Sequence, residues 1–413
     1  MQPASIDDYK DPREKLLELE RAISSRVFER EEEIRGFLIG LIARAHVLFL
    51  GPKGAAKSAL ARLLCDAVAW SGVPEGQDPY FRAQLARDSV LDELFGPVSA
   101  KGYEEDTFRR NTAGMLPEAK VGLLEEIYKS NPTVLSRLLT LLNEGVFKNG
   151  TEPERAVPLR LVVGTSNELP DGRDDNLDAF HDRFMLRYEV SYLKDRASQR
   201  KMMERANSNE RRAPLSPIVT EEEIEQAAEQ ARGVDVSPVF DAIDDILVAL
   251  ADREIVPSDR RRAALVPLVK AQAYLEGRTS AVRGDLAVLS HALWEDPDHI
   301  TEVTRIVLKE ANPHAAHAHR LFDAAHDSYT AAMKAHRAAK AHGDAETPEA
   351  EKAREDETTA GMNAITALKN AARRLFELKE AAKDSGADPA AISKLLQKTT
   401  AMNEEVTQKC IGI

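Results

Sequence analysis

Cysteine is almost absent from this chain. Only Cys65 and Cys410 occur among its 413 residues. Two cysteines are too few for a disulfide framework or for a zinc site built from cysteines. We therefore expect a protein of the reducing cytoplasm.

Long apolar runs and an excess of basic residues are missing as well. The longest apolar run, around residues 47–50, is far shorter than a membrane span. The first residues, MQPASIDDYKDPREK, are polar and acidic, whereas a secretory signal is basic and then apolar. The formal net charge of −13 makes nucleic acid an unlikely partner, because phosphate binding usually leaves a basic footprint.

What is present is typical of a folded globular protein. Apolar residues make up 43% of the chain and charged residues 30%, which argues against a disordered protein. A chain of 413 residues is expected to form two or three domains. We place them at 1–205, 206–305 and 306–413, because the sequence turns polar and proline-containing at 206–219 and alanine-rich after Pro313.

The first segment alternates strands and helices. Its apolar spacing predicts one amphipathic helix over residues 12–43. Short apolar runs predict strands at 46–50, 80–85, 122–124 and 159–165, with helices between them. This alternation favours an α/β fold in which helices cover both faces of a parallel sheet.

In the other two segments apolar residues recur at the spacing of a helix. Residues 220–305 are predicted to form a small all-α domain. Three further helices are expected at 314–342, 348–383 and 389–410, the last two starting at proline-containing caps. Their apolar stripes predict an antiparallel three-helix coiled coil, an arm or docking element without chemistry of its own.

A phosphate-binding loop is the strongest motif in the chain. The stretch FLGPKGAAKSAL follows the 46–50 strand and opens a helix, where backbone N–H groups can face phosphate oxygens. Lys57 would reach the outer phosphates and the Ser58 hydroxyl would ligate Mg²⁺. Ala56 replaces the expected glycine, at little cost if its φ is negative. The predicted nucleotide-binding residues are Gly51, Pro52, Lys53, Gly54, Ala55, Ala56, Lys57, Ser58 and Ala59. The alternative is a plain Gly/Ala-rich turn with a solvated lysine.

Two adjacent acids end a second predicted strand, in VGLLEEIYKS. Parallel strands end on one edge of a sheet, so Glu125 and Glu126 are expected near the phosphate loop. Glu125 could hold Mg²⁺ and Glu126 could polarise the attacking water. The competing interpretation is a pair of acids that favours a helix start through the helix dipole.

Three more polar residues complete this set. Asn167 ends the strand in VVGTSNELP and could orient a water molecule, although such residues often cap a turn. Arg183, in FHDRFMLR, could stabilise charge on a transferring phosphoryl group, or simply pair with Asp182. Arg260, in VPSDRRR, could reach a nucleotide from the all-α domain, or lie on a solvated helix start.

Histidines concentrate late in the chain. His314, His317 and His319 have a spacing that permits a shared metal, but no cluster of acids or cysteines accompanies them. A polar coiled-coil surface explains them as well, and a metal is the less favoured interpretation.

In order and spacing these motifs resemble the MoxR branch of the AAA+ ATPases, and within it the RavA subfamily. The stretches that carry the resemblance are FLGPKGAAKS, ELFGPVS, AGMLPEAKVGLLEEIYKS, LLTLLNEGVFKNG, LVVGTSNELP, FHDRFMLR and VPSDRR…AYLEGRTSAV. The resemblance covers roughly residues 12–305. It implies an αβα AAA+ core with an all-α lid, joined into a ring, usually a hexamer, with ATP at each subunit boundary.

The resemblance also implies roles for individual residues. Residues 51–58 would be the Walker A loop, Glu125 and Glu126 Walker B, and Asn167 sensor 1. Arg183 would be the arginine finger of a neighbouring site, and Arg260 sensor 2, with Arg261 as the close alternative. The stretches FGPVSAKGYEEDTFRRNTAGMLPEA and FKNGTEPERAVP would be loops that contact substrates.

Two departures from the family pattern stand out. The family has Asp where this chain has Glu125, which affects metal geometry and turnover. Residues 306–413 contain no strand-rich insertion like that of RavA, so the metabolic-enzyme partner bound by that insertion is not implied.

The resulting hypothesis is an ATP- and Mg²⁺-dependent, ring-forming, chaperone-like remodeller. Members of this family typically act with a von Willebrand factor A partner and a protein client. A slow nucleotide-gated scaffold is the alternative, and a nucleic-acid motor is the least favoured class.

Overall fold

The computed structural model describes residues 11–104, 106–169, 175–207, 215–342, 347–385, 387 and 389–411. Its contacts divide the chain into two compact units. The first consists of Met1–Ser237, Ile255–Ala281 and Val288–Val303, and the second of Pro238–Glu254, Val282–Ala287 and Thr304–Ile413. Helices of the predicted 206–305 segment are thus shared between the two units.

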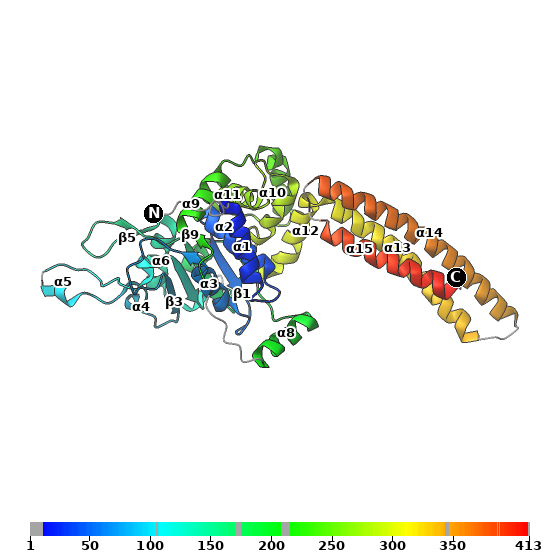
Figure 1. The fold of residues 1–413 in the computed structure, drawn as a ribbon, viewed down its shortest axis with the longest axis horizontal. Helices are drawn as coiled ribbons and strands as arrows, with labels where there is room; N and C mark the ends of the chain where they lie inside the picture. The colour runs from blue at the N-terminus through cyan, green and yellow to red at the C-terminus, as the bar shows by residue number, and fades with distance from the viewer. Residues whose placement is uncertain are drawn as a thin grey trace, which may run out of the picture. The chain divides into compact units, whose positions relative to one another are not determined.

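A five-stranded parallel sheet forms the centre of the first unit (Figure 1). In spatial order its strands are β3 (Tyr80–Gln84), β4 (Val121–Glu125), β7 (Leu161–Ser166), β1 (His46–Leu50) and β8 (Phe184–Glu189). All residues of β7 and nearly all of β1 are buried, as expected for a sheet covered by helices on both faces. The four predicted strands and the parallel α/β architecture are confirmed.

The predicted single helix at 12–43 is wrong. Two helices replace it, α1 (Pro12–Ser24) and α2 (Glu31–Ala43). Between them Glu29 has a left-handed backbone, and its carboxylate accepts hydrogen bonds from the backbone N–H groups of Lys194 (2.8 Å) and Asp195 (3.0 Å). These contacts distant in sequence override a helical period that continues through the break.

The other helices of the first unit are short and mostly amphipathic. Asn131 caps α6, accepting from the N–H of Val134, and Gly145 ends that helix with a left-handed backbone. The helices are α3 (Lys57–Asp66), α4 (Leu91–Phe95), α5 (Ala100–Glu104), α6 (Pro132–Glu144), α7 (Asp175–His181), α8 (Arg196–Asn207), α9 (Glu221–Arg232) and α11 (Asp259–Leu275). Two small sheets add β2 (Val68–Ala69) parallel to β9 (Val219–Thr220), and β5 (Val146–Phe147) antiparallel to β6 (Arg155–Ala156).

The second unit is helical. It contains α10 (Phe240–Ala251), most of α12 (Ile300–Ala311), and α13 (Pro313–His342), α14 (Pro348–Asp384) and α15 (Ala390–Val406). A π-helical turn, Thr407–Ile411, follows α15. The three helices predicted for the arm are confirmed to within a few residues, because prolines and the Thr347 cap mark two of their starts.

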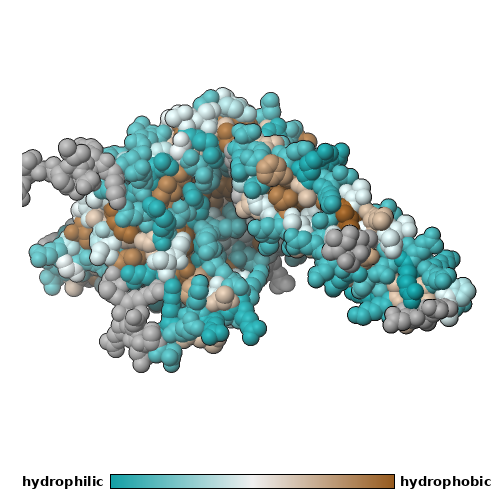
Figure 2. Space-filling view, turned by 45° about the vertical axis from the view of Figure 1, so that its right-hand side comes forward, coloured by the Kyte–Doolittle hydropathy of each residue, from teal (hydrophilic) through white to brown (hydrophobic). Residues whose placement is uncertain are grey.

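The three long helices pack side by side (Figure 1). Their contacts are made largely by alanine, with larger residues such as Leu368, Leu375 and Ile392 spaced along the seam. The arm surface seen in Figure 2 is mostly hydrophilic. In the described part of the chain, no helix is long and apolar enough to cross a membrane.

Candidate nucleotide-binding site

The loop between β1 and α3 has the backbone of a phosphate cradle. Gly51 has a φ of 146°, and a Cβ there would lie 2.0 Å from the carbonyl oxygen of Val190, so only glycine fits. Ala56 has a φ of 65°, which contradicts the expected negative value. This conformation costs an alanine about 1–2 kcal/mol. No side chain among the described residues caps α3, so its first N–H groups are available to a phosphate.

Lys57 lies at the first position of α3, with only 8% of its surface exposed. Its Nζ donates to the carbonyl oxygens of Gly51 and Pro52 and to the side-chain oxygen of Asn167, the last at 3.3 Å. Burial lowers the pKa of Lys57, while the nearby carboxylates of Glu126 and Glu125 raise it. The ammonium is thus held by oxygen atoms at the mouth of the loop.

Glu125 ends β4 beside the phosphate loop. Its Oε1 accepts a hydrogen bond from the Ser58 hydroxyl. Its Oε2 pairs with Arg82 Nε at 2.7 Å, from the neighbouring strand β3. The predicted metal ligands Ser58 and Glu125 therefore lie together, and a third group that the motif did not indicate binds the carboxylate.

Glu126 is 7% exposed and has a left-handed backbone with a φ of 55°. Such a conformation is uncommon for residues other than glycine and is found preferentially at functional sites. Its Oε1 accepts from Asn167 Nδ2 at 2.8 Å, and Lys129 Nζ lies 3.0 Å from its Oε2. The strand ends align because Leu50 pairs with Ser166 and Glu125 with Thr165 in the sheet.

These residues line one cavity of about 290 Å³. Arg82, Gln84 and Thr165 were not predicted from the sequence; they come from strand ends without a recognisable motif. Arg183 and Arg260 are not among the lining residues. The lining consists of Lys53, Gly54, Ala55, Ala56, Lys57, Ser58, Ala59, Arg82, Gln84, Glu125, Glu126, Thr165 and Asn167.

An apolar cavity of about 490 Å³ adjoins the first and shares Gly54, Ala55 and Ala56 with it. One wall is the turn between α1 and α2. There the Arg205 guanidinium stacks 4.0 Å above the Phe28 ring. The remaining lining residues are Arg26, Val27, Arg30, Tyr192, Leu193, Gln199 and Met202. The two neighbouring cavities therefore suit a ligand in which a planar apolar group is attached to a phosphate chain.

Arg183 precedes β8, and its guanidinium is partly buried. In the described part of the chain, neither Nε nor Nη1 of Arg183 has a hydrogen-bond partner, although both atoms are inaccessible to solvent. The preceding residue, Asp182, contacts Arg260 (3.7 Å), Arg261 (3.2 Å) and the Ser258 hydroxyl (3.2 Å). The side chain of Arg183 thus does not form the pair with Asp182 that was considered from the sequence.

Arg260 and Arg261 occupy different environments. Arg260 has a half-exposed side chain. Arg261 is fully buried, and its guanidinium donates to the carbonyl oxygens of Phe184 (3.2 Å), Met185 (3.2 Å) and Ala292 (2.6 Å). The side chain of Arg261 is therefore committed to the protein interior.

A second buried guanidinium lies beside it. Arg187 donates to the carbonyl oxygens of Trp294 and of His181, the latter at 3.1 Å. Burial lowers the pKa of Arg187 to about 9, and lowers that of His181 to about 2, with both arginines adding to the effect on His181. Two cations and a neutral imidazole thus hold the segment that carries Arg183.

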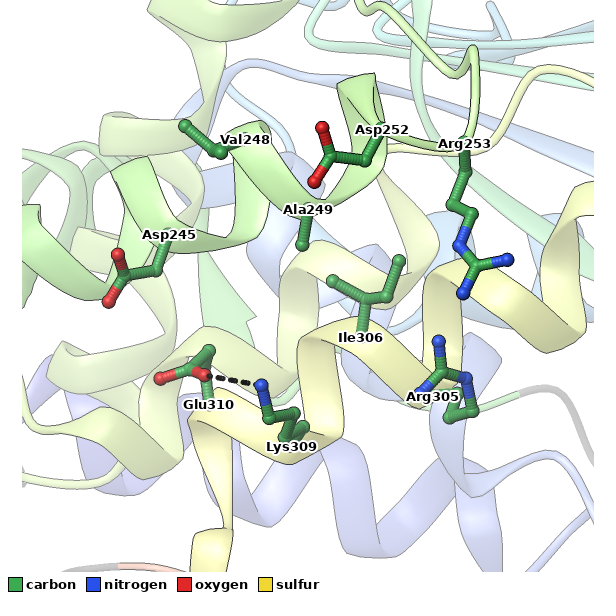
Figure 3. A pocket seen from close by; sticks show the side chains of 9 residues that line it. All are labelled: Asp245, Val248, Ala249, Asp252, Arg253, Arg305, Ile306, Lys309 and Glu310. Carbon is green, nitrogen blue, oxygen red and sulfur yellow. Dashed lines mark ion pairs between the residues drawn. The ribbon is translucent and has the colours of Figure 1, made fainter.

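The second unit has a cavity of its own, of about 630 Å³ (Figure 3). Asp245 reaches it from α10, Asp252 from the residue just after that helix, and Arg305 and Lys309 from α12. Glu310 pairs with Lys309 at 3.8 Å and with Arg283 at 2.9 Å. Both of these ion pairs involve α12 and neither reaches α10, and we assign no ligand to this cavity.

Comparison with known proteins identifies the family. A family model described as the MoxR domain in the MoxR-vWA-beta-propeller ternary systems matches residues 14–229. A model of the AAA lid domain matches residues 238–307. The chain belongs to the MoxR family of AAA+ ATPases. Its fold is accordingly an AAA+ αβα core followed by an all-α lid and a helical C-terminal arm.

The relatives of this MoxR-family chain include proteins of other sizes. Two uncharacterized proteins of Methanocaldococcus jannaschii are each 34% identical to it, over 73% of this chain and 76% and 78% of theirs. The chaperone protein ClpB of Bacillus cereus is 29% identical over 40% of this chain, which is 20% of ClpB. A crystal structure of a candidate ATPase from Cytophaga hutchinsonii shares the fold, with a TM-score of 0.58 and 20% identity over 72% of this chain and 94% of that one.

Proposed function

We propose that this protein hydrolyses ATP with Mg²⁺ at the phosphate loop, in a ring of identical subunits that remodels a protein client. One observation carries the proposal. Lys57, Asn167 and Glu126 form a continuous chain of contacts beside the uncapped start of α3, next to the contact of Ser58 with Glu125. A turn with a solvated lysine would have none of these links.

The residues present fit a magnesium ion. A hydroxyl and a carboxylate in mutual contact are the oxygen ligands that Mg²⁺ takes in sites of this kind, together with phosphates and water. Ser58 and Glu125 would hold it. Bound there, the ion would neutralise charge on the phosphate oxygens.

Different side chains of the site have different roles in ATP binding and hydrolysis. Lys57 and the N–H groups at the start of α3 bind the phosphate chain, and the apolar cavity beside Ala55 and Ala56 takes the base. Glu126 accepts a proton from the attacking water. Asn167 holds the Glu126 carboxylate and so sets the position of that water.

The proposed ring explains two arginines that do not line their own phosphate pocket. Arg183 has two N–H groups without a partner among the described residues, and its partly buried guanidinium would have to turn outward to offer them to a phosphate on a neighbouring subunit. Arg260, half-exposed, remains the candidate for sensor 2, because Arg261 is bound by carbonyl oxygens. A hexamer is the ring size that we propose.

A protein partner and a client complete the proposal. The description of the matching family model names vWA and beta-propeller components, and we infer a von Willebrand factor A partner for this chain. The β5–β6 hairpin and the loop around α5, with Phe108 48% exposed, offer surfaces for a client. Two buried free cysteines support a reducing cytoplasm. RavA remains the subfamily that we favour.

A slow, nucleotide-gated scaffold is the second candidate, and Arg82 is the reason to keep it. Both oxygens of Glu125 are engaged, by Ser58 and by Arg82, so a metal must compete with a guanidinium for the carboxylate. Such a protein would bind ATP and assemble but turn over slowly.

ATP hydrolysis by the purified full chain tests the proposal. We expect Mg²⁺-dependent phosphate release, which Glu126→Gln lowers by about 10²–10⁴-fold while ATP binding is retained. Glu168→Gln, an exposed acid two residues beyond Ser166, serves as the matched control and should keep full activity. If wild type and Glu126→Gln bind ATP and are equally inactive, the scaffold is correct.

A further inference from the structure

Three potential metal ligands of different kinds converge in the helical arm. They are His336 on α13, Glu357 on α14 and Cys410 in the π-helical turn after α15. One ligand atom from each lies within 4.8 Å of the other two. No other such group of three or more His, Cys, Asp or Glu ligands occurs in the part of the chain that the structure describes.

The contacts within the group are close. His336 Nδ1 lies 2.6 Å from Glu357 Oε1, and both side chains are mostly buried, with 21% and 16% exposed. The Cys410 thiol is 8% exposed and lies 3.9 Å from the carbonyl oxygen of Ala332. Burial raises the pKa of this thiol, and the charge of Glu357 raises it further, so the carboxylate and the sulfur influence each other.

The position of Cys410 is unusual for an arm that has only a packing role. A π-helical turn is rare and is often found at functional sites. Here it directs the sulfur toward a seam that consists mainly of alanine, among them Ala325, Ala332 and Ala364. A hydrogen bond between His336 and Glu357, and donation from the Cys410 thiol to the carbonyl oxygen of Ala332, satisfy the three groups singly. Neither contact accounts for the convergence of a nitrogen, an oxygen and a sulfur ligand at one place.

We propose that His336, Glu357 and Cys410 bind a divalent transition metal of the zinc class. Nitrogen, oxygen and sulfur are the three donors that Zn²⁺ takes, at about 2.0–2.3 Å, which in a tetrahedron separates the ligand atoms by about 3.3–3.6 Å. Shifts of about 1 Å convert the observed separations into these. Three protein ligands leave one coordination position for water.

The site differs from the ones considered from the sequence. Two cysteines exclude a site built from cysteines alone, but one thiolate with an imidazole and a carboxylate is a different donor set. His317 and His319 are exposed and are not part of the group. The ligands come from three helices, so a bound metal would cross-link the arm at one level.

Cobalt titration of the metal-free full chain, without nucleotide, tests the proposal. We expect a single Co²⁺ per chain with a thiolate-to-cobalt charge-transfer absorption, displaced by Zn²⁺. Cys410→Ser should abolish the absorption, and His336→Gln should lower the affinity at least about tenfold. Cys65→Ser and His319→Gln are the matched controls and should bind as wild type does. Cobalt at the phosphate loop would lack the thiolate absorption.

A measurement on the unmutated chain covers the case in which a variant fails to fold. Zn²⁺ should slow alkylation of the Cys410 thiol and raise the thermal midpoint of unfolding. The proposal is overturned if no charge-transfer absorption appears, if it persists in a folded Cys410→Ser variant, or if Zn²⁺ leaves alkylation of Cys410 unchanged.

Discussion

The side-chain amide of Asn167 donates a hydrogen bond to the carboxylate of Glu126 across 2.8 Å. The same amide group accepts from Lys57 through its oxygen, so the residue that we assign to water activation is tied to the residue that we assign to phosphate binding. A change at the phosphate can therefore reach Glu126 through a single side chain.

Arg82→Gln should increase the apparent affinity for Mg²⁺ several-fold. The substitution removes a cation that lies 2.7 Å from Glu125, which leaves the carboxylate free for the metal. The measurement is a Mg²⁺ titration of ATP hydrolysis. Arg87→Gln, at an exposed residue of the following loop, is the control. An unchanged or weaker Mg²⁺ dependence in Arg82→Gln would show that Glu125 does not hold the metal.

Arg183→Ala should abolish hydrolysis but retain ATP binding, because we assign this side chain to a neighbouring site. Mixing Arg183→Ala with Lys57→Ala subunits should restore part of the activity. At some subunit boundaries an intact Lys57 then faces an intact Arg183 of the neighbouring subunit. Phosphate release across a range of mixing ratios measures this. Absence of any recovery in assembled mixtures counts against a shared site.

Phe28→Ala should weaken ATP binding about tenfold or more, because stacking of a base on an aromatic ring contributes roughly 1–3 kcal/mol. Phe28 lines the apolar cavity and not the phosphate pocket. Inorganic triphosphate is the matched ligand, and its affinity should not change. Equal losses for both ligands would place the base elsewhere.

Substitutions of Arg260 and Arg261 should have different effects, one on activity and the other on stability. Arg261→Leu removes a fully buried guanidinium that contacts Asp182, and should destabilise the fold by about 3–5 kcal/mol. Arg260→Ala should change stability by at most about 1 kcal/mol, since its ion pair is half-exposed, yet lower ATP hydrolysis. Denaturant unfolding and phosphate release measure the two effects. Full activity in Arg260→Ala would remove it as sensor 2.

Glu33→Gln should stabilise the protein at neutral and higher pH. Burial raises the pKa of Glu33 from 4.5 to about 7. The folded state therefore loses stability as pH rises from 4.5 to 7, to a total of about 3 kcal/mol. Glutamine removes this loss, so the variants should differ above pH 7 and converge below pH 4.5. Glu31→Gln, exposed on the same turn of α2, should show no such divergence.

Motifs that are contiguous in sequence placed most of the candidate site residues at one edge of the sheet. Residues 51–59 form one loop and helix start, and Glu125, Glu126 and Asn167 lie at or just after the ends of strands that align in a parallel sheet. Their roles remain proposals. The starts of α14 and α15 were predictable for a similar reason, since proline acts locally on the backbone.

What sequence reasoning missed depends on contacts between distant segments. In the sequence, Arg82 is only a polar residue of a short strand. Its contact with Glu125 arises because β3 pairs with β4 in the folded sheet. The break between α1 and α2 is set by bonds from Glu29 to residues 194 and 195, and that break creates a wall of the apolar cavity. The φ of Ala56 is a property of the folded loop, which no composition rule indicates.

The buried position of Arg261 has a consequence for communication between subunits. Its guanidinium joins the start of α11 to the carbonyl oxygens on both sides of the turn that presents Arg183. In the proposed ring, movement of α11 in one subunit would displace the arginine that serves the next. Such coupling is reciprocal in binding free energy. ATP binding in one subunit would therefore favour one lid position in its neighbour, and that lid position would change the affinity for ATP by the same factor.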